Sequence, residues 1–480
     1  MNRTSRLSGH IRRWWPAWIL VGAALVIRLV HLYLTVTKNP LAESLTLDAA
    51  IYDRWARAII TGGETVASNL IQAPLYPWFM AALYKIFSPS AAVVRIFQAL
   101  MGSASCAFTI VITYRLFRSR AGAITAGTIH ALYLPLIFYE GVLVPVTLIV
   151  FLNLLSITIL VSRDGFPGTG RMILSGLFLG VSIATKPVSA LLVPFLALHL
   201  YFYGRADGKL SASTAWKTSL RGTLLLLAGI IAAIAPVTIR NARMTGEFIP
   251  ISSGLGINFY HGANPEANGY YAAPTYKRIY IGATPEDQAR SIAMIASNEE
   301  GRKLKASEVS QFWLRKGIEY NLEHPDRFRR LVATKALFFW NKHERTNVEN
   351  FNFHRDLPGV LGLPLFTFGI VAPLGLMGIF LARSRCKSLW ILYGGVITYF
   401  AACVIFYVLA RYRLPVVTFL IPFAGIGLVE LYSMARKRSF PDLLLSTAAL
   451  ALVFYLINLG IVADTITGES SFLTRVGKAH

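Results

Sequence analysis

Two carboxylates in the sequence stand where acid–base chemistry could use them. Asp48 opens the stretch Leu47–Ile60, and Tyr52 follows one turn later on the same face of the helix that the apolar spacing predicts. Glu140 ends an apolar run. A positioned carboxylate can accept a proton from a hydroxyl group, and two together could bind a divalent cation. The plainer alternatives are that Asp48 only caps its helix and that Glu140 is only solvated.

Six basic residues stand beside apolar runs at one predicted depth, where isolated positive charges are disfavoured. They are Arg95, Lys186, Arg240, Arg243, Arg411 and Arg413. Arginine matches phosphate oxygens with a fork of N–H groups, and lysine supplies a point charge. Together the six predict a site for a lipid phosphate. The alternative is that each side chain reaches water singly or pairs with an acid.

The elements that must position these residues are apolar runs of membrane-spanning length. Such runs occupy residues 14–37, 91–116, 121–139, 142–162, 218–239, 359–382, 388–409, 413–434 and 441–463. The stretch 171–205 is expected to be a hairpin of two spans that turns at Lys186-Pro187, and the proline-interrupted run 73–89 is expected to lie at the interface. The sequence therefore predicts an all-α polytopic membrane protein with about eleven transmembrane helices.

The charges of the loops predict the orientation of these helices. With a cytoplasmic N-terminus, the predicted inside loops include the basic clusters 115–120, 383–387 and 436–438, as the positive-inside rule requires. Two hydrophilic regions then lie outside, namely the first loop 38–90, with amphipathic helices, and a large ordered insert 240–358. The chain thus divides into a membrane module 1–239, the insert 240–358 and C-terminal membrane helices 359–480.

The composition supports a membrane protein and excludes several other classes. Of 480 residues, 55% are hydrophobic and only 15% are charged, with a mean hydropathy of +0.52. A soluble domain carries about 25% charged residues. The net charge of +23 arises mainly from short loops, so we predict no nucleic-acid partner. The three cysteines lie outside the insert and offer no disulfide framework.

The sequence resembles the GT-C glycosyltransferases related to the protein O-mannosyltransferases and the lipid A aminoarabinose transferase (glycosyltransferase families 39 and 83). The resemblance covers nearly the whole chain and rests on short motifs in a fixed order. They are Asp48-x-x-x-Tyr52 with Gly62-Gly63, Ala73-Pro74-Leu75-Tyr76-Pro77, Arg95-x-x-Gln98, Tyr139-Glu140, Thr185-Lys186-Pro187, Ile239-Arg240-Asn241, Gly256 to Pro265, and Ala410-Arg411-Tyr412-Arg413-Leu414-Pro415. Gln72 stands where the family often has Lys or His, so neither the sugar nor the acceptor is defined.

The resemblance implies a GT-C fold and an inverting transfer of a sugar from a polyprenyl-phosphate carrier to a protein, lipid or glycan. The active site would face the periplasm at a bacterial inner membrane. Asp48 would be the general base and Glu140 a second acid that positions the acceptor or the base. The six basic residues would neutralise the leaving phosphate. The residues expected to contact the substrate are Tyr52, Asn258, His261, Asn264 and Glu344.

Within the insert, the polar residues have a plainer alternative. Asn258, His261 and Asn264 could hydrogen-bond a sugar or simply build a turn-rich loop. Thr284 followed by Pro285 predicts the start of a helix. No histidine pair has metal-ligand spacing, so we predict no zinc and no other cofactor; a divalent cation has no further support in the sequence.

Other functional classes remain open at this point. A lipid-carrier flippase or other transporter would also be polytopic and basic, but it rarely needs a large external insert, and no repeat relates two halves of the chain. A polymerase or ligase of polyprenyl-linked glycans would share a lipid-phosphate substrate and a large external loop. An enzyme that uses a nucleotide sugar is disfavoured, because no Gly-rich phosphate loop follows a strand.

Overall fold

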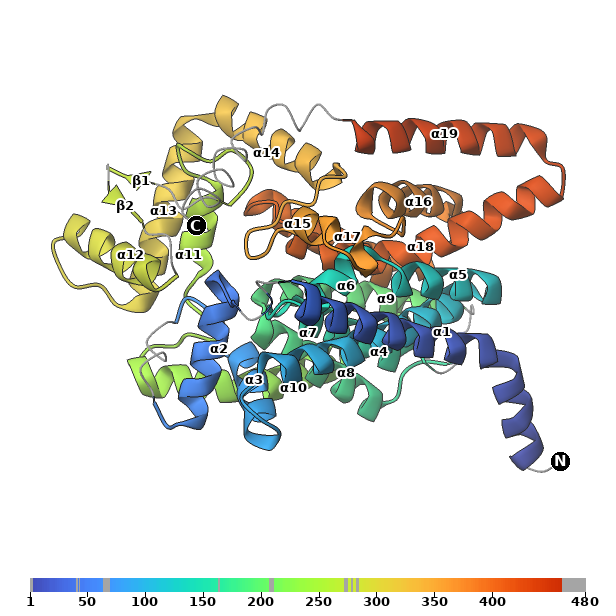
Figure 1. Cartoon of the computed structure of the whole chain (residues 1–480), viewed down its shortest axis with the longest axis horizontal. Coiled ribbons are helices and arrows are strands. Elements are labelled where there is room, and N and C mark those ends of the chain that lie inside the picture. The colour runs from blue at the N-terminus through green and yellow to red at the C-terminus, as the bar shows by residue number, and fades with distance from the viewer. Residues whose placement is uncertain are drawn as a thin grey trace.

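The chain folds almost entirely into helices (Figure 1). The computed structural model describes residues 3–39, 42, 44–63, 70–162, 165–206, 211–271, 275–277, 279–281 and 285–459. The first half contains α1 (Arg3–Lys38), α2 (Leu47–Ile60), α3 (Leu75–Ile86), α4 (Ala91–Phe117), α5 (Arg120–Ala131), α6 (Leu134–Glu140), α7 (Val146–Val161), α8 (Thr169–Thr185), η1 (Pro187–Leu192), α9 (Val193–Ala206) and α10 (Ala212–Thr245).

The second half begins with the insert. Its elements are α11 (Leu255–Gly262), β1 (Thr275–Tyr276), β2 (Ile279–Tyr280), α12 (Pro285–Glu299), α13 (Ala306–Glu323), α14 (Pro325–Trp340) and α15 (Phe351–Asp356). The C-terminal part contains η2 (Val360–Gly362), α16 (Phe368–Leu381), η3 (Arg383–Ser388), α17 (Trp390–Ile405), α18 (Ala410–Arg436) and α19 (Phe440–Asn458). β1 and β2 pair antiparallel.

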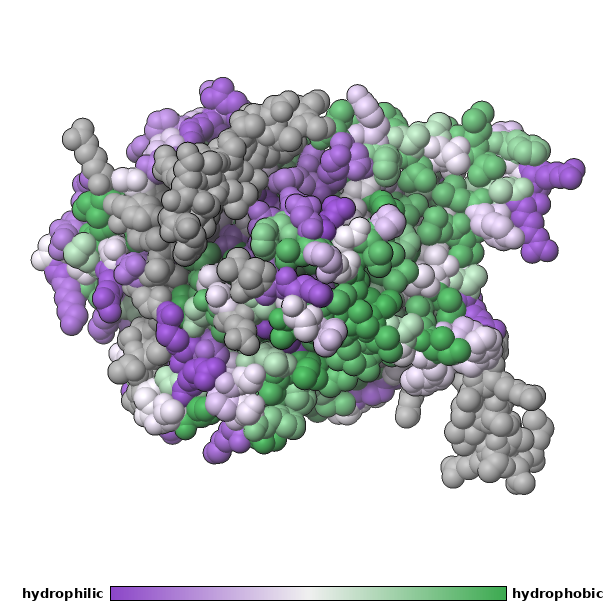
Figure 2. All heavy atoms as spheres, viewed as in Figure 1, coloured by the Kyte–Doolittle hydropathy of each residue, from purple (hydrophilic) through white to green (hydrophobic). Residues whose placement is uncertain are grey.

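The apolar helices make the chain a multi-pass membrane protein. Among the described residues, 6 helices are long and apolar enough to cross a membrane: α1 from Trp14 onward, α4, η1 with α9, α10, α18 and α19. Four shorter apolar helices are α7, α8, α16 and α17. Hydrophobic residues colour much of the surface around α1, α4 and α19, and hydrophilic residues gather at the end that carries α2 and α12 (Figure 2). The count of eleven crossings stays a prediction.

The predicted run 121–139 differs from the structure, because it is broken into α5 and α6. Pro135 lies in the first turn of α6 and has no N–H to continue the helical ladder of α5. Tyr133 is extended at the break, and the Leu134 N–H donates to the Phe366 carbonyl at 2.9 Å. The break gives α6 a direction of its own, which carries Glu140 into the protein interior.

Two predicted boundaries of the insert also shift. The helix α10 continues beyond residue 239 to Thr245 and ends with Gly246 in the left-handed region, at φ 67°. Arg240 and Arg243 therefore lie on a helix. At the other end, α16 begins only at Phe368, nine residues after the start predicted for this span. Thr284, the predicted cap of α12, lies outside the described residues.

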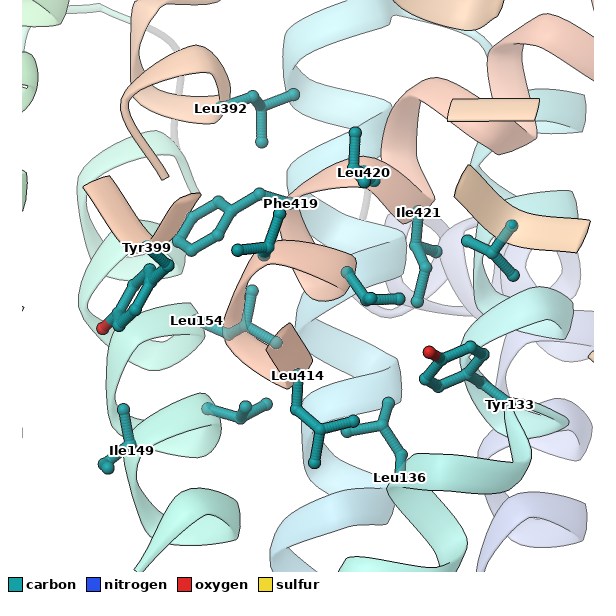
Figure 3. Packing of buried hydrophobic residues seen from close by; sticks show 14 of the residues in the cluster. Tyr133, Leu136, Ile149, Leu154, Leu392, Tyr399, Leu414, Phe419, Leu420 and Ile421 are labelled. Atoms are coloured by element: carbon teal, nitrogen blue, oxygen red, sulfur yellow. The ribbon is translucent and has the colours of Figure 1, made fainter. Parts of the chain in front are cut away.

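The core is built around α18, which most of the other membrane helices surround. Its residues Leu414, Phe419, Leu420 and Ile421 are fully or almost fully buried. They pack against side chains from the α5–α6 region, α7 and α17, as Figure 3 shows. Because α18 is held on all these sides, its first turn, which bears the Arg411 and Arg413 motif, has a fixed position.

The insert has a small core of its own and docks on the start of α18. Trp313 of α13 is fully buried and packs on Tyr260 of α11, with ring centroids 4.7 Å apart. A Cβ at Gly262 would lie 1.7 Å from the carbonyl oxygen of Phe406, so only glycine permits this close approach of α11 to the segment before α18. The Ser253 N–H donates to the Leu70 carbonyl, which ties the insert to the first loop.

Candidate active site

An ion pair joins the first loop to the last third of the chain. Arg411 Nη1 lies 2.7 Å from Asp48 Oδ2, and the two side chains are 9% and 17% exposed. Asp48 lies in the first turn of α2, whose limits match the predicted stretch. The residue at the cap position is Thr46, and its side chain makes no cap hydrogen bond. Asp48 is therefore an ion-pair partner rather than the helix cap.

Lys186 joins this pair through Tyr412. The chain folds back after α8, and the Ser182 and Ser189 hydroxyls lie 3.0 Å apart across the turn. Lys186 Nζ lies 5.1 Å from the centre of the Tyr412 ring, and Arg411 Cζ lies 5.2 Å from it. A cation over an aromatic ring is attracted by the negative face of the ring.

We call Asp48, Lys186 and Arg411 the charged cluster, which carries two positive charges and one negative charge. Among the described residues, no carboxylate lies within ion-pair distance of Lys186. Arg411 Nε is buried and has no hydrogen-bond partner. A buried N–H without a partner is costly, and an anion bound here would satisfy it. The cluster is thus suited to a phosphate next to a carboxylate.

Tyr52 lies beside the charged cluster, as its spacing from Asp48 predicts. It is 8% exposed, and its ring meets that of Tyr76 edge-on at 5.2 Å. Burial raises the pKa of the Tyr52 hydroxyl far above its usual value, and the negative charge of Asp48 adds to this effect. Tyr52 therefore stays protonated and can act only as a neutral hydrogen-bonding group.

A row of aromatic rings connects the insert to the charged cluster. Tyr271 lies 5.2 Å from Tyr407, which in turn lies 5.7 Å from Tyr412, measured between ring centroids. The Tyr407 hydroxyl donates to Asn258 Oδ1 at 2.8 Å. Sequence reasoning found Asn258 but missed Tyr271 and Tyr407. The sequence feature that could have indicated Tyr407 as a site residue is its position three residues before the 410–415 motif.

His261 and Asn264 have different surroundings within the insert. His261 is 3% exposed, stacks edge-on with Tyr271 at 5.1 Å, and has no partner on either ring nitrogen. Burial lowers its pKa to about 4, so the ring is neutral near pH 7. Asn264 Nδ2 donates to the carbonyls of Tyr260 and His261, which fits the turn-building alternative.

Glu140 has a partner that the sequence analysis did not foresee. Its Oε2 lies 2.6 Å from Arg28 Nε, and the two side chains are only 3% and 1% exposed. Arg28 also donates to the Ala131 carbonyl. The alternative that Glu140 is only solvated is thus ruled out, because the break before α6 turns Glu140 inward; its role as a second acid stays a prediction. The missed signal was Arg28 itself, a lone charge within an apolar run.

Arg95 holds two backbone carbonyls. It is 5% exposed, and it donates to the carbonyls of Gly141 at 2.9 Å and Ala42 at 2.7 Å. That Arg95 binds the donor phosphate stays a prediction. An arginine that satisfies carbonyls at a helix end stabilises the turn between α6 and α7.

Arg413 likewise makes contacts within the protein, and its role as a phosphate ligand stays a prediction. It is 2% exposed and donates to Glu344 Oε2 at 2.7 Å, and also to the carbonyls of Phe339, Asn341 and His343. Glu344 is buried as well, which raises its pKa although the charge of Arg413 opposes this. The pair fixes the segment that follows α14.

The two arginines of α10 lie near its C-terminal end, and their role as phosphate ligands stays a prediction. Arg240 Nη1 donates to the side chain of its neighbour Asn241 at 3.1 Å. Arg243 is exposed in the last turn of α10. Of the six predicted phosphate ligands, Lys186 and Arg411 therefore meet around one ring. No group of three or more His, Cys, Asp or Glu side chains in the described part of the chain could hold a metal ion.

The family match falls on the first half of the chain. Residues 71–239 match the family model described as dolichyl-phosphate-mannose-protein mannosyltransferase. Over these residues the chain is similar to this family of glycosyltransferases. The matched segment contains Lys186, whereas Asp48 precedes it and Arg411 follows it. No curated protein sequence matches the chain significantly.

A solved structure shows that the chain shares its fold with an oligosaccharyltransferase. The archaeal oligosaccharyltransferase AglB from Archaeoglobus fulgidus, solved with an inhibitory peptide and a dolichol-phosphate, matches with a TM-score of 0.50 and 12% identity, over 93% of this chain and 55% of that chain. The chain thus spans about half the length of AglB. ArnT from Cupriavidus metallidurans, bound to undecaprenyl phosphate, matches with a TM-score of 0.37 and 16% identity, over 87% of this chain and 78% of that chain.

Proposed function

We propose that the chain transfers a sugar from a polyprenyl-phosphate carrier to a hydroxyl group of a protein, lipid or glycan, with inversion at the anomeric carbon. The observation that carries the proposal is the 2.7 Å contact between Asp48 and Arg411, with Lys186 beside them over Tyr412. A carboxylate next to two cations provides a general base and an anion site within one cluster. Such a transfer needs both of these.

In the first part of the reaction, Asp48 Oδ accepts the proton of the acceptor hydroxyl. The hydroxyl oxygen then attacks the anomeric carbon from the face opposite the phosphate, and the bond from that carbon to the phosphate oxygen breaks. Asp48 is partly exposed, at 17% of its side chain, so an acceptor can approach it. The electron pair of the broken bond stays on the lipid phosphate, whose negative charge increases.

In the same step, Arg411 and Lys186 stabilise the leaving phosphate. Arg411 Nε is the unpartnered donor, and it can bind a phosphate oxygen while Nη1 keeps its contact with Asp48. Lys186 adds a positive charge on the other side of Tyr412. Fixed cations that meet the developing charge lower the barrier without reorganising.

The proposed location is a bacterial inner membrane with a cytoplasmic N-terminus and a periplasmic active site. The direction of two helices supports this arrangement. The α4 helix runs from Ala91 to Phe117, next to the basic cluster 115–120. The α18 helix runs from Ala410 to Arg436, where the basic cluster 436–438 begins. The basic loops therefore lie at the opposite ends of these helices from the charged cluster, as expected of cytoplasmic loops.

The proposal is tested with purified protein in liposomes that contain a panel of radiolabelled polyprenyl-phosphate sugars, beginning with the mannose form. We expect transfer of label to membrane acceptors and release of polyprenyl monophosphate. Use of a diphosphate-linked oligosaccharide alone would favour the polymerase or ligase. Movement of the carrier across the bilayer without cleavage would favour the flippase.

A pair of matched variants tests the anion site. Lys186→Met should raise the KM for the donor by about tenfold or more, because a charge-assisted contact to the phosphate is lost. Arg243→Met removes the same charge from an exposed position outside the charged cluster and should leave the KM unchanged. Equal effects of the two substitutions would contradict the assignment of Lys186.

A further inference from the structure

Gln98 lies at one end of a path of contacts that leads to Asp48. Gln98 is fully buried in α4, and both ends of its amide are used. Nε2 donates to the carbonyls of Glu140 and Val142, each at 2.9 Å, and Oε1 accepts from the Tyr76 hydroxyl at 2.8 Å. Because only the NH₂ group can donate to two carbonyls, the amide has one orientation, and its oxygen faces Tyr76.

Tyr76 extends this path to the helix that bears Asp48. It is 1% exposed on α3, and its ring meets that of Tyr52 edge-on, at 5.2 Å and an interplanar angle of 79°. Tyr52 follows Asp48 by one turn of α2. Edge-on aromatic pairs are stabilised beyond their buried area, so the position of the Tyr76 ring restricts where the first turn of α2 can lie.

Two arginines fix the turn that Gln98 contacts at its own end of the path. Arg95 lies one turn before Gln98 on α4 and donates to the Gly141 carbonyl. The carbonyls of residues 140, 141 and 142 are therefore all held from α4. Arg28 holds the side chain of Glu140 from α1. Two helices, α4 and α1, thus fix the turn from which Gln98 and Tyr76 take their positions.

We infer that Gln98 is a positioning residue for the proposed base: through Tyr76 and Tyr52 it orients the Asp48 carboxylate toward Arg411 and the acceptor. The inference rests on the proposed function, because it takes Asp48 as the group that accepts the proton. Gln98 contacts neither the charged cluster nor a substrate. Displacement of a reacting group by about 1 Å lowers a rate by roughly 10²-fold. Loss of the Gln98 contact with Tyr76 should therefore lower the rate of sugar transfer.

Two variants of different severity test the inference. Tyr76→Phe removes only the hydroxyl and keeps the ring, whereas Gln98→Leu removes both ends of the amide. In the liposome assay, with the polyprenyl-phosphate sugar that the wild type uses, we expect the maximal rate to fall about 10-fold and about 10²-fold, respectively. The KM for the donor should stay unchanged, because Lys186 and Arg411 are not altered. The double variant should be no slower than Gln98→Leu, because both substitutions break the same contact.

The control is Ser103→Ala, which removes another buried hydroxyl from α4. The Ser103 hydroxyl donates only within its helix, to the Ala99 carbonyl at 2.9 Å, and the maximal rate should be unchanged.

A raised donor KM at an unchanged maximal rate, or losses that multiply in the double variant, would overturn the inference. If Asp48→Asn transfers as fast as the wild type, or the wild type transfers no sugar, the proposed function fails and the inference fails with it. If Asp48→Asn is inactive but the folded Tyr76→Phe and Gln98→Leu proteins keep the full rate, only the positioning role is wrong.

Discussion

The ion pair between Asp48 and Arg411 joins the first turns of α2 and α18, which are 363 positions apart in the sequence. The contact gives the carboxylate a fixed neighbour and leaves Arg411 Nε without a partner. One guanidinium is therefore placed to contact the base and a phosphate together. This arrangement accounts for the choice of arginine over lysine, whose single ammonium group has no planar fork.

Substitution of Arg411 should impair both contacts of its guanidinium, the one with Asp48 and the one with the phosphate. We expect Arg411→Gln to lower kcat/KM for the donor by about 10²-fold or more, the usual effect of removing one fixed donor from a developing anion. Arg411→Lys should retain part of the activity, because it keeps the charge but not the fork. Steady-state transfer rates at varied donor concentration measure both effects. Equal activity of the glutamine variant and the wild type would be incompatible with a role in phosphate binding.

Arg413 lies two residues further on and should behave differently. Arg413→Met leaves Glu344 buried without its partner, and we expect a loss of about 3–5 kcal/mol in the free energy of unfolding. The double variant Arg413→Met/Glu344→Gln should recover part of this loss, because no buried charge remains. Thermal denaturation of the purified variants measures the difference. A stable Arg413→Met protein with weakened donor binding would instead support the phosphate role that the sequence predicted.

The buried pair of Arg28 and Glu140 depends on a glycine. A Cβ at Gly102 would lie 2.1 Å from Glu140 Oε1, so Gly102→Ala must displace the carboxylate. We expect a destabilisation of several kcal/mol, within the range of about 3–5 kcal/mol for a broken buried pair. Gly22→Ala is the matched control, because no atom lies within 4 Å of its added Cβ and alanine favours a helix. Similar melting temperatures for the two variants would show that the pair tolerates displacement.

Much of this arrangement follows from the sequence, and the remainder does not for identifiable reasons. The limits of α2 and the turn at Lys186 were predictable, because apolar spacing, glycines and proline are local signals. The predicted spans also assigned each basic residue a depth along its helix. They did not give the direction of its side chain around that helix. Arg95 and Lys186 had the same predicted depth, yet Arg95 faces the carbonyl of Gly141 and Lys186 faces Tyr412.

Glu140 shows a second limit of the sequence. Its position at the end of an apolar run was predicted, but its ion pair with Arg28 spans 112 residues. Such a pair depends on how α1 packs against α6, and helix packing is not encoded in local spacing. The same reason explains why Tyr407 and Asn258, 149 residues apart, were not predicted to share a hydrogen bond.

Lys335 should make the stability of the insert depend on pH. This lysine of α14 is 1% exposed, and burial lowers its pKa to about 8, from the usual 10.5. The unfolded chain binds more protons than the folded chain between these two values, so stability should rise as the pH increases from 8 to 10.5. Below pH 8 the buried charge costs about 3 kcal/mol.

We therefore expect Lys335→Met to be more stable than the wild type at pH 7, with a difference that shrinks as the pH approaches 10.5. Melting temperatures of both proteins across this range measure the difference. A constant gap between the two proteins would contradict a lowered pKa for Lys335.

The central claim is that Asp48 is the base of a sugar transfer, and the substitution Asp48→Asn tests it most directly. The measurement is transfer of label from the radiolabelled polyprenyl-phosphate sugar in liposomes, beside Asp53→Asn as a control. Asp53 lies on the same helix and bears the same charge, but it accepts from Tyr84 at 2.5 Å and pairs with Arg57 at 2.8 Å. We predict that folded Asp48→Asn binds the donor and loses transfer by about 10²–10⁴-fold, while Asp53→Asn keeps most of it. Transfer by Asp48→Asn at the wild-type rate would contradict the account.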